Sequence, residues 1–114
     1  MPDPRERRLP VLRQQGWEHQ RSNVEGTFAL GRLFATPGVL HAMLAAGDEL
    51  FLYLARHARG DWGDVGAEDW RLNDQALVSG ARLLSAYRLR DGVRVWVITE
   101  SDRSSTTVLL PDEY

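Results

Sequence analysis

The dipeptide Asp91-Gly92 stands between two segments in which apolar and polar residues alternate, RLLSAYRL before it and VRVWVITE after it. Asp-Gly in such a setting is a strong short-range signal for a β-hairpin. A second turn, SDRS, and a third alternating segment, STTVLLP, follow. The C-terminal third of the chain therefore predicts three strands in an antiparallel meander.

The first turn also predicts a register. If Asp91-Gly92 forms a two-residue turn, Arg90 pairs with Val93 and Tyr87 lies opposite Trp96.

The second turn extends this register to the third strand. With Ser101–Ser104 as the turn, Glu100 faces Ser105 and Trp96 faces Leu109. One face of the sheet then forms the core face, with Leu84, Ala86, Val93, Val95, Val97, Val108 and Leu110. The other face mixes aromatic and polar groups, as a binding surface or half-wet cleft does: Ser85, Tyr87, Trp96, Ile98, Glu100 and Thr107, with Leu83, Leu89 and Leu109. A second, smaller core covered by the N-terminal arm is the alternative.

Before the meander, the chain shows helix signals. Residues 27–36, TFALGRLFAT, alternate enough for a strand. In TPGVLHAMLAAG, Thr36 is placed as the N-cap, Pro37 at the first helical position and Gly47 as the C-terminal stop.

Two further helices follow the same logic. Asp48 is placed to cap ELFLYLARHA, which Gly60 ends, and Gly80 closes AEDWRLNDQALVSG. The predicted fold class is α+β: an N-terminal strand and about three helices packed on a C-terminal antiparallel sheet of three to four strands. Residues 1–25, with three prolines, are expected to be a mobile or partner-bound arm, and residues 26–114 a single domain.

Composition excludes several function classes. The 114 residues fit one domain, and the absence of cysteine excludes thiol chemistry and disulfides. All fourteen basic residues are arginine, so a P-loop lysine or a Schiff-base lysine is impossible. The net charge of −2 argues against a dedicated duplex-DNA binder. Without a secretory signal or a long apolar run, the chain is expected to be cytoplasmic and not membrane-bound.

The stretch HARGDWGDVGAEDW, residues 57–70, concentrates acids and tryptophans between two predicted helices. Its acids match no calcium-loop spacing, so we expect no metal and no cofactor. Helix ends account for most of its residues. We expect Trp62 to fold back as a plug against the core, leaving a rigid corner whose acids Asp61 and Asp64 can meet a partner.

Acid–base chemistry is one reading of the titratable residues. His57 and Glu100 are the candidate pair, with Arg82, Arg103 and Tyr87 as charge stabilisers. This arrangement is similar to the plan of metal-independent, toxin-type ribonucleases, although no diagnostic motif supports it. The corresponding structural roles are a helix-end histidine for His57, a strand-end salt bridge for Glu100 and a turn tip for Arg103.

Binding is the other reading, and it needs no catalytic constellation. Large aromatic residues dominate interface energetics, and an arginine-rich hairpin can contact phosphates or an acidic protein surface. An acidic loop and a basic hairpin on one small protein would also suit a homodimer. The candidate binding residues are Trp62, Asp61, Asp64, Tyr87, Trp96, Arg88, Arg90 and Arg94.

Several segments together carry a family resemblance: LGRLFATPGVL, HARGDWGD, ND-x-AL-x-x-G-x-RLLSAY and W-x-ITE-x-DRS-x-TT-x-LLP-x-EY. Over about residues 29–114 the chain resembles small "plasmid-related" hypothetical proteins encoded on bacterial plasmids, integrative elements and phages. Some of these proteins are labelled "type I restriction endonuclease subunit M". The resemblance implies an accessory protein of mobile genetic elements and brings no catalytic residues with it.

The methyltransferase activity in that label finds no support in the residues, because the chain lacks a glycine-rich turn after a first parallel strand and an acidic-aromatic catalytic motif. We therefore expect a non-enzymatic protein that binds a macromolecular partner. A protein partner is favoured over a nucleic acid bound through the Arg82–Arg94 hairpin. The toxin-type endoribonuclease is the alternative.

Overall fold

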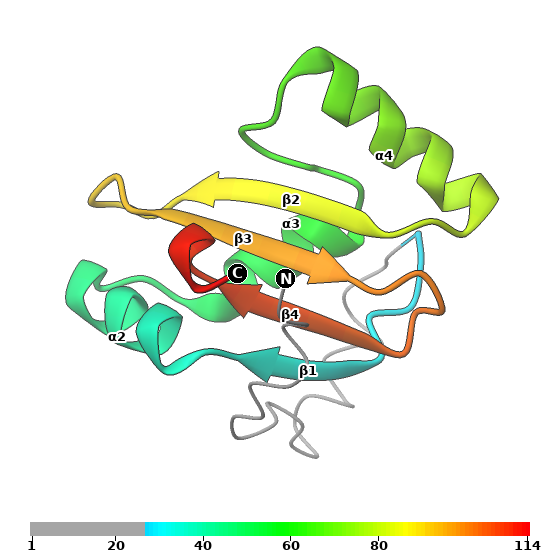
Figure 1. Cartoon of the computed structure of the whole chain (residues 1–114). Helices are drawn as coiled ribbons and strands as arrows, with labels where there is room; N and C mark the ends of the chain where they lie inside the picture. Colours follow the sequence, from blue (N-terminus) through cyan, green and yellow to red (C-terminus); the bar gives the residue numbers. More distant parts are fainter. Residues whose placement is uncertain (1–26) are drawn as a thin grey trace.

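The computed structural model describes residues 27–114, which form three helices and a four-stranded sheet. The order is β1 (Arg32–Ala35), α2 (Pro37–Ala46), α3 (Leu50–Ala58), α4 (Ala67–Ser79), β2 (Leu83–Arg88), β3 (Arg94–Thr99), β4 (Ser105–Leu109) and the short 3-10 helix η2 (Pro111–Glu113). The predicted α+β class is confirmed (Figure 1). The predicted arm, residues 1–25, lies outside the described residues.

The sheet is mixed, which the sequence did not predict. Its strand order is β1-β4-β3-β2, and β2, β3 and β4 form the expected antiparallel meander. The N-terminal strand β1 joins this meander at its edge, parallel to β4, with Leu33 opposite Thr106.

The register predicted for the first hairpin is wrong by one residue. Leu89, not Arg90, pairs with Val93, as the bond from the Leu89 N–H to the Val93 carbonyl at 2.8 Å shows. The loop therefore has three residues, and Gly92 takes a left-handed conformation with φ of 92°. This is the three-residue loop that ends in a left-handed glycine, not the two-residue turn. The register of the second hairpin is confirmed, since Trp96 lies opposite Leu109.

This shift moves the side chains of β2 to opposite faces, because side chains alternate along a strand. Tyr87 pairs with Val95 and Ala86 with Trp96. We call the face that packs on α3 the helix face and the other the front face. The helix face carries Leu33, Ala35, Ser85, Tyr87, Val95, Val97, Thr99, Thr106 and Val108, and the front face carries Phe34, Leu84, Ala86, Arg88, Arg94, Trp96, Ile98, Thr107 and Leu109. The predicted mixed face therefore does not exist as one surface.

The helix boundaries follow the predicted capping residues in two of three cases. The Thr36 hydroxyl accepts from the Val39 N–H at 3.1 Å, and Gly47 and Gly80 end α2 and α4 in left-handed conformations. The prediction for Asp48 is wrong, because Glu49 is the N-cap of α3 and Asp48 instead accepts from the Tyr53 hydroxyl at 2.7 Å.

The core lies between the helix face and the helices. One cluster joins β1, α2, α3 and the helix face, with Val39, Leu54 and Val97 among its buried members. A smaller cluster of Trp62, Ala76 and Leu83 packs α4 against β2. Within residues 27–114, no single helix is long and apolar enough to cross a membrane, and α2 with α3 passes that test only as a pair bent by 110°.

Candidate functional site

His57 lies at the centre of a buried polar network on the helix face. It belongs to the last turn of α3 and is fully buried. Its Nδ1 is 2.5 Å from the Ser85 hydroxyl of β2, and its Nε2 is 2.8 Å from the Thr99 hydroxyl of β3. The network continues from Thr99 to Thr106 of β4 at 2.7 Å and from Thr106 to the Leu30 carbonyl at 2.7 Å. It thus connects α3 with three strands.

The direction of each hydrogen bond in this network can be assigned from its last member. A carbonyl only accepts, so the Thr106 hydroxyl donates to Leu30 and must accept from Thr99. The Thr99 proton is then used, and Thr99 accepts from the Nε2–H of His57. Nδ1 carries the lone pair and accepts from the Ser85 hydroxyl. His57 is therefore neutral, with its proton on Nε2.

The surroundings of His57 oppose protonation. Burial, the larger cause, and the charge of Arg103 together lower the pKa of His57 from 6.5 to about 3. Phe28 and Trp62 contact the ring edge-on, at centroid distances of 5.3 and 5.6 Å. A charged imidazolium there would be enclosed by aromatic groups and hydroxyls without a carboxylate partner.

A serine hydroxyl donating to a histidine is half of a nucleophilic triad, but this pair is not placed for catalysis. Ser85 and Thr99 are as completely buried as His57, so no substrate carbonyl or phosphate can approach the Ser85 oxygen in this structure. The site stabilises the sheet. The sequence analysis missed the pairing of Ser85 with His57, because its register for the first hairpin placed Ser85 on the face of the sheet away from the helices.

The proposed acid–base pair is not brought together. His57 faces Ser85 and Thr99 on the helix face, whereas Glu100 continues the β3–β4 ladder one residue after Thr99 and so points to the front face. Glu100 lies 3.7 Å from Arg82. Proton transfer needs hydrogen-bond reach or one bridging water, and the sheet separates the two groups.

Arg103, one of the proposed charge stabilisers, joins segments of the fold. Its guanidinium donates to the backbone carbonyls of Ala81 at 2.6 Å, Ala76 at 3.0 Å and Glu100 at 3.2 Å, and it lies over the Phe28 ring. Arg103 also has φ of 60°. This arrangement uses the guanidinium as a clamp between the β3–β4 turn and the C-terminal end of α4.

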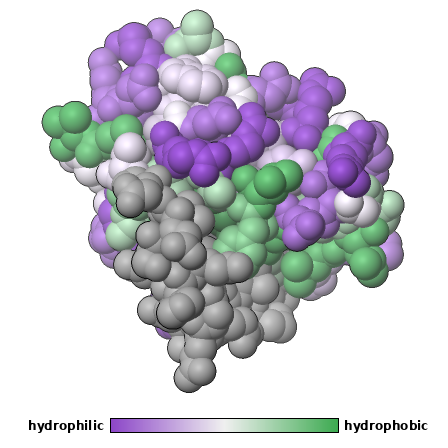
Figure 2. Space-filling model, turned by 180° about the vertical axis from the view of Figure 1, so that it is seen from behind, coloured by the Kyte–Doolittle hydropathy of each residue, from purple (hydrophilic) through white to green (hydrophobic). Residues whose placement is uncertain are grey.

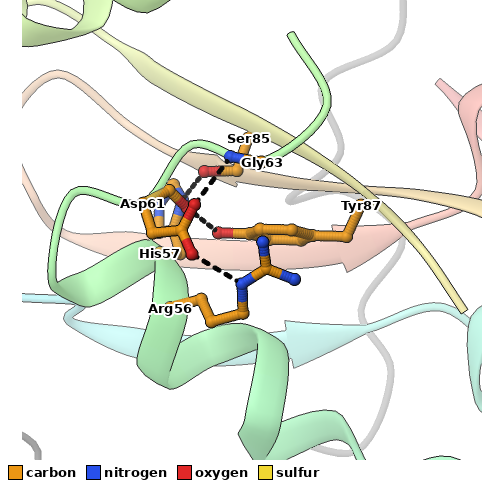
Figure 3. A network of polar contacts seen from close by, with 6 residues as sticks. All are labelled: Arg56, His57, Asp61, Gly63, Ser85 and Tyr87. Atoms are coloured by element: carbon orange, nitrogen blue, oxygen red, sulfur yellow. Dashed lines mark hydrogen bonds and ion pairs between the residues drawn. The ribbon is translucent and has the colours of Figure 1, made fainter.

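The corner after α3 confirms the predicted plug. Trp62 is fully buried, and its Nε1–H donates to Asp74 of α4 at 2.9 Å. Asp61 accepts from Arg56 at 2.7 Å, and the Tyr87 hydroxyl donates to the Asp61 carbonyl at 2.6 Å (Figure 3). The hydrogen bond from Arg56 lowers the pKa of Asp61, and burial raises the pKa of Tyr87.

Two of the three aromatic binding candidates are therefore closed to a partner. Trp62 and Tyr87 are core residues. Trp96 is half-buried on the front face, 5.8 Å from the Tyr114 ring.

The charged binding candidates lie at the surface, and most of their charges are paired. Arg88 donates to Asp64 at 3.0 Å, an ion pair that lowers the pKa of Asp64. Arg90 donates to the Gly47 carbonyl at 3.1 Å. Arg94 lies directly opposite Arg88 in the register of β2 and β3, and its side chain is exposed. The structure thus assembles Asp64, Arg88 and Arg94 into one surface cluster and places Arg90 at α2.

Within the described residues, no three histidine, aspartate or glutamate side chains form a group that could hold a metal ion. No protein-family model, curated protein or solved structure matches the chain.

The most unusual surface feature is one that the sequence analysis did not single out. Helix α2, PGVLHAMLAA, contains no charged residue, yet only Val39 and Met43 of it are buried. Leu44 is 81% exposed and Leu52 of α3 is 60% exposed, and Leu40 is exposed as well. We call Leu40, Leu44 and Leu52 the leucine surface. The uncharged sequence of α2 was the available signal, since a helix that is apolar on all sides is normally covered.

Proposed function

We propose that this protein acts by binding another protein through the leucine surface. The observation that carries the proposal is α2, an uncharged helix that exposes leucine where a surface helix normally carries charge. Figure 2 views the molecule from the side of α3 and shows apolar residues at that surface between polar patches. A sizeable exposed apolar patch is typical of a protein interaction site.

The energetics support a protein partner. Fully burying an exposed leucine side chain contributes ~1.5–3 kcal/mol, and Leu44 at 81% exposure retains most of this gain, whereas the partly covered Leu40 and Leu52 retain less. A nucleic acid is a poor fit for α2, because contacts between positive side chains and phosphates supply most of a protein's affinity for nucleic acid and α2 has no charged residue.

The resemblance to plasmid, integrative-element and phage proteins supports the setting of this proposal. We infer an accessory protein of a mobile genetic element that acts in the cytoplasm of its bacterial host by contact and without catalysis. The His57–Glu100 geometry gives no support to the ribonuclease alternative.

Affinity capture with quantitative mass spectrometry tests the proposal. The tagged full-length chain is used as bait in host extract, in wild-type form and as Leu44→Glu and Leu52→Glu. The matched control is Val78→Glu, because Val78 is 92% exposed on α4, away from the leucine surface. We expect a stoichiometric partner with the wild type and with Val78→Glu, and at least about tenfold less of it with both leucine variants.

Capture that is equal for all four proteins would contradict the proposal. Light scattering of the purified chain distinguishes a second explanation. If the wild type is a dimer and Leu44→Glu a monomer, the leucine surface binds a second copy instead of another protein.

A further inference from the structure

Strand β2 lies at the edge of the sheet, and part of its backbone points outward. The strand order β1-β4-β3-β2 leaves β3 as the one strand beside it among residues 27–114. The Leu89 N–H bonds the Val93 carbonyl, and in an antiparallel pair every second residue bonds the neighbouring strand in this way. The N–H and C=O groups of Leu84, Ala86 and Arg88 therefore point away from β3. An uncovered edge of this kind is a template for pairing with another strand.

Asn73 of α4 closes the edge at Leu84. Its Nδ2 donates to the Leu84 carbonyl at 2.7 Å, and its Oδ1 accepts from the Leu84 N–H at 3.1 Å. One amide side chain thus supplies the donor and the acceptor that a residue of a neighbouring strand would supply. Asparagine is a weaker helix former than alanine, and Asn73 is buried in the middle of α4, so this contact and not the helix explains its presence.

The corner after α3 closes the edge at Ala86. The Ala86 N–H donates to the Trp62 carbonyl at 3.1 Å, and the Asp64 N–H donates to the Ala86 carbonyl at 2.6 Å. This pairing is a single parallel bridge between Gly63 and Ala86. Within residues 27–114, no such contact reaches the backbone of Arg88. Leu84 and Ala86 are therefore closed to another strand, whereas Arg88 is not.

The corner and α4 together form what we call the edge cover, residues 62–79. The Trp62 Nε1–H donates to Asp74 at 2.9 Å and so ties the corner to the helix. Of the thirteen residues of α4, only Asn73 and Ala76 are buried, and the helix lies beside β2 at the edge of the sheet (Figure 1). An element with so little buried surface opens at a lower free energy than the strands of the core.

We propose that the edge cover holds β2 closed against a second copy of this chain, and that its opening lets the β2 strands of two copies pair. The strand is complementary to itself. If two copies run antiparallel about a two-fold axis at Ala86, each Leu84 lies opposite Arg88 of the second copy. The outward groups of all three residues then find partners, including those of Arg88. The two arginines do not face each other, so no like charges oppose the pairing.

This inference does not rest on the proposed function, because it does not use the leucine surface. Every chain in the test carries Leu44→Glu, so that association through the leucine surface is not counted. Hydrogen exchange of the Leu84 amide is followed by NMR, with and without Asn73→Ala, at low and at high protein concentration. Light scattering gives the mass. The matched control is Gln75→Ala, at an exposed position of the same helix.

We expect Asn73→Ala to speed exchange of the Leu84 amide at least about tenfold at low concentration, because both hydrogen bonds to Leu84 are lost. At high concentration this variant should double its mass, and the Leu84 and Ala86 amides should become slow again. The Leu44→Glu chain and its Gln75→Ala variant should remain monomers with slow exchange at both concentrations.

Three outcomes would overturn the inference. Leu84 exchange that stays slow in a monomeric Asn73→Ala variant would show that Asn73 does not hold the cover. Fast exchange without a gain in mass would show that the open edge does not accept a second copy. A gain in mass with Leu84 exchange still fast would place the contact elsewhere.

A measurement with Asn73 intact decides the matter if Asn73→Ala does not fold. Hydrogen exchange of the Leu44→Glu chain in low urea compares the Leu84 amide with the Val97 amide of β3. We expect Leu84 to exchange together with the amides of α4 and faster than Val97, because the cover opens while the strands stay paired. Exchange of Leu84 and Val97 at one common rate would refute a separate opening of the cover.

Discussion

At the scale of single residues, His57 makes the stability of the fold depend on pH. Its pKa is about 3 in the folded chain and 6.5 as the ordinary value, so the unfolded chain binds the proton more tightly. Its stabilising contribution is complete above pH 6.5 and is lost as the pH falls toward 3. The expected slope approaches ~1.4 kcal/mol per pH unit inside that window.

Urea unfolding of the wild type and of His57→Gln between pH 7 and pH 5 measures this slope. Glutamine can donate to Thr99 and accept from Ser85 but does not titrate, so we expect the loss of stability on acidification to flatten in the variant. The lowered pKa values of Asp48 and Asp61 start from 3.8 and so act at lower pH. His41→Gln, at an exposed histidine, is the control and should keep the wild-type slope. Equal slopes for the wild type and His57→Gln would refute the assignment.

At the scale of elements, the corner between α3 and α4 depends on a glycine. Gly63 has φ of 78°, and a Cβ there would overlap the Ala86 carbonyl oxygen and the Tyr87 ring. Gly80 has φ of 81° with open space around it. Gly63→Ala should lower the free energy of unfolding by ~3 kcal/mol or more, and Gly80→Ala by ~1–2 kcal/mol, since only the first adds crowding to backbone strain. Denaturant unfolding gives both values. Similar losses for the two variants would show that the corner shifts away from Ala86 and Tyr87 and so accommodates the added methyl group.

The sequence was sufficient for elements whose signals are local. The Thr36 cap, the Pro37 start and the glycine stops at Gly47 and Gly80 each depend on neighbouring residues, and each was predicted correctly. The register predicted for the first hairpin was wrong because Asp91-Gly92 fits both a two-residue turn and a three-residue loop. The resulting error of one residue in the register placed Ser85 and Tyr87 on the wrong face of the sheet. The His57 network could therefore not be predicted.

At the scale of the whole molecule, the parts that the sequence could not predict are those joined over long separations. The parallel pairing of β1 with β4 connects residues more than seventy positions apart, and no local pattern specifies it. The same holds for the bond from Thr106 to the Leu30 carbonyl, which completes the His57 network. Trp62 was predicted as a plug because capping did not explain it, although its partner Asp74 could not be named in advance.

Arg103 offers a test of how these distant parts are held together. Its guanidinium clamps Ala76 and Ala81 to the β3–β4 turn, while its φ of 60° costs backbone strain. Arg103→Ala loses the clamp and keeps the strain, whereas Arg103→Gly loses the clamp and relieves the strain. We expect both to be less stable than the wild type by ~2 kcal/mol, with the glycine variant ~0.5–1 kcal/mol the more stable of the two. Thermal and urea unfolding measure that order. If Arg103→Ala is as stable as the wild type, the guanidinium does not hold the turn to α4. If Arg103→Gly is the least stable of the three proteins, the φ of 60° costs no backbone strain.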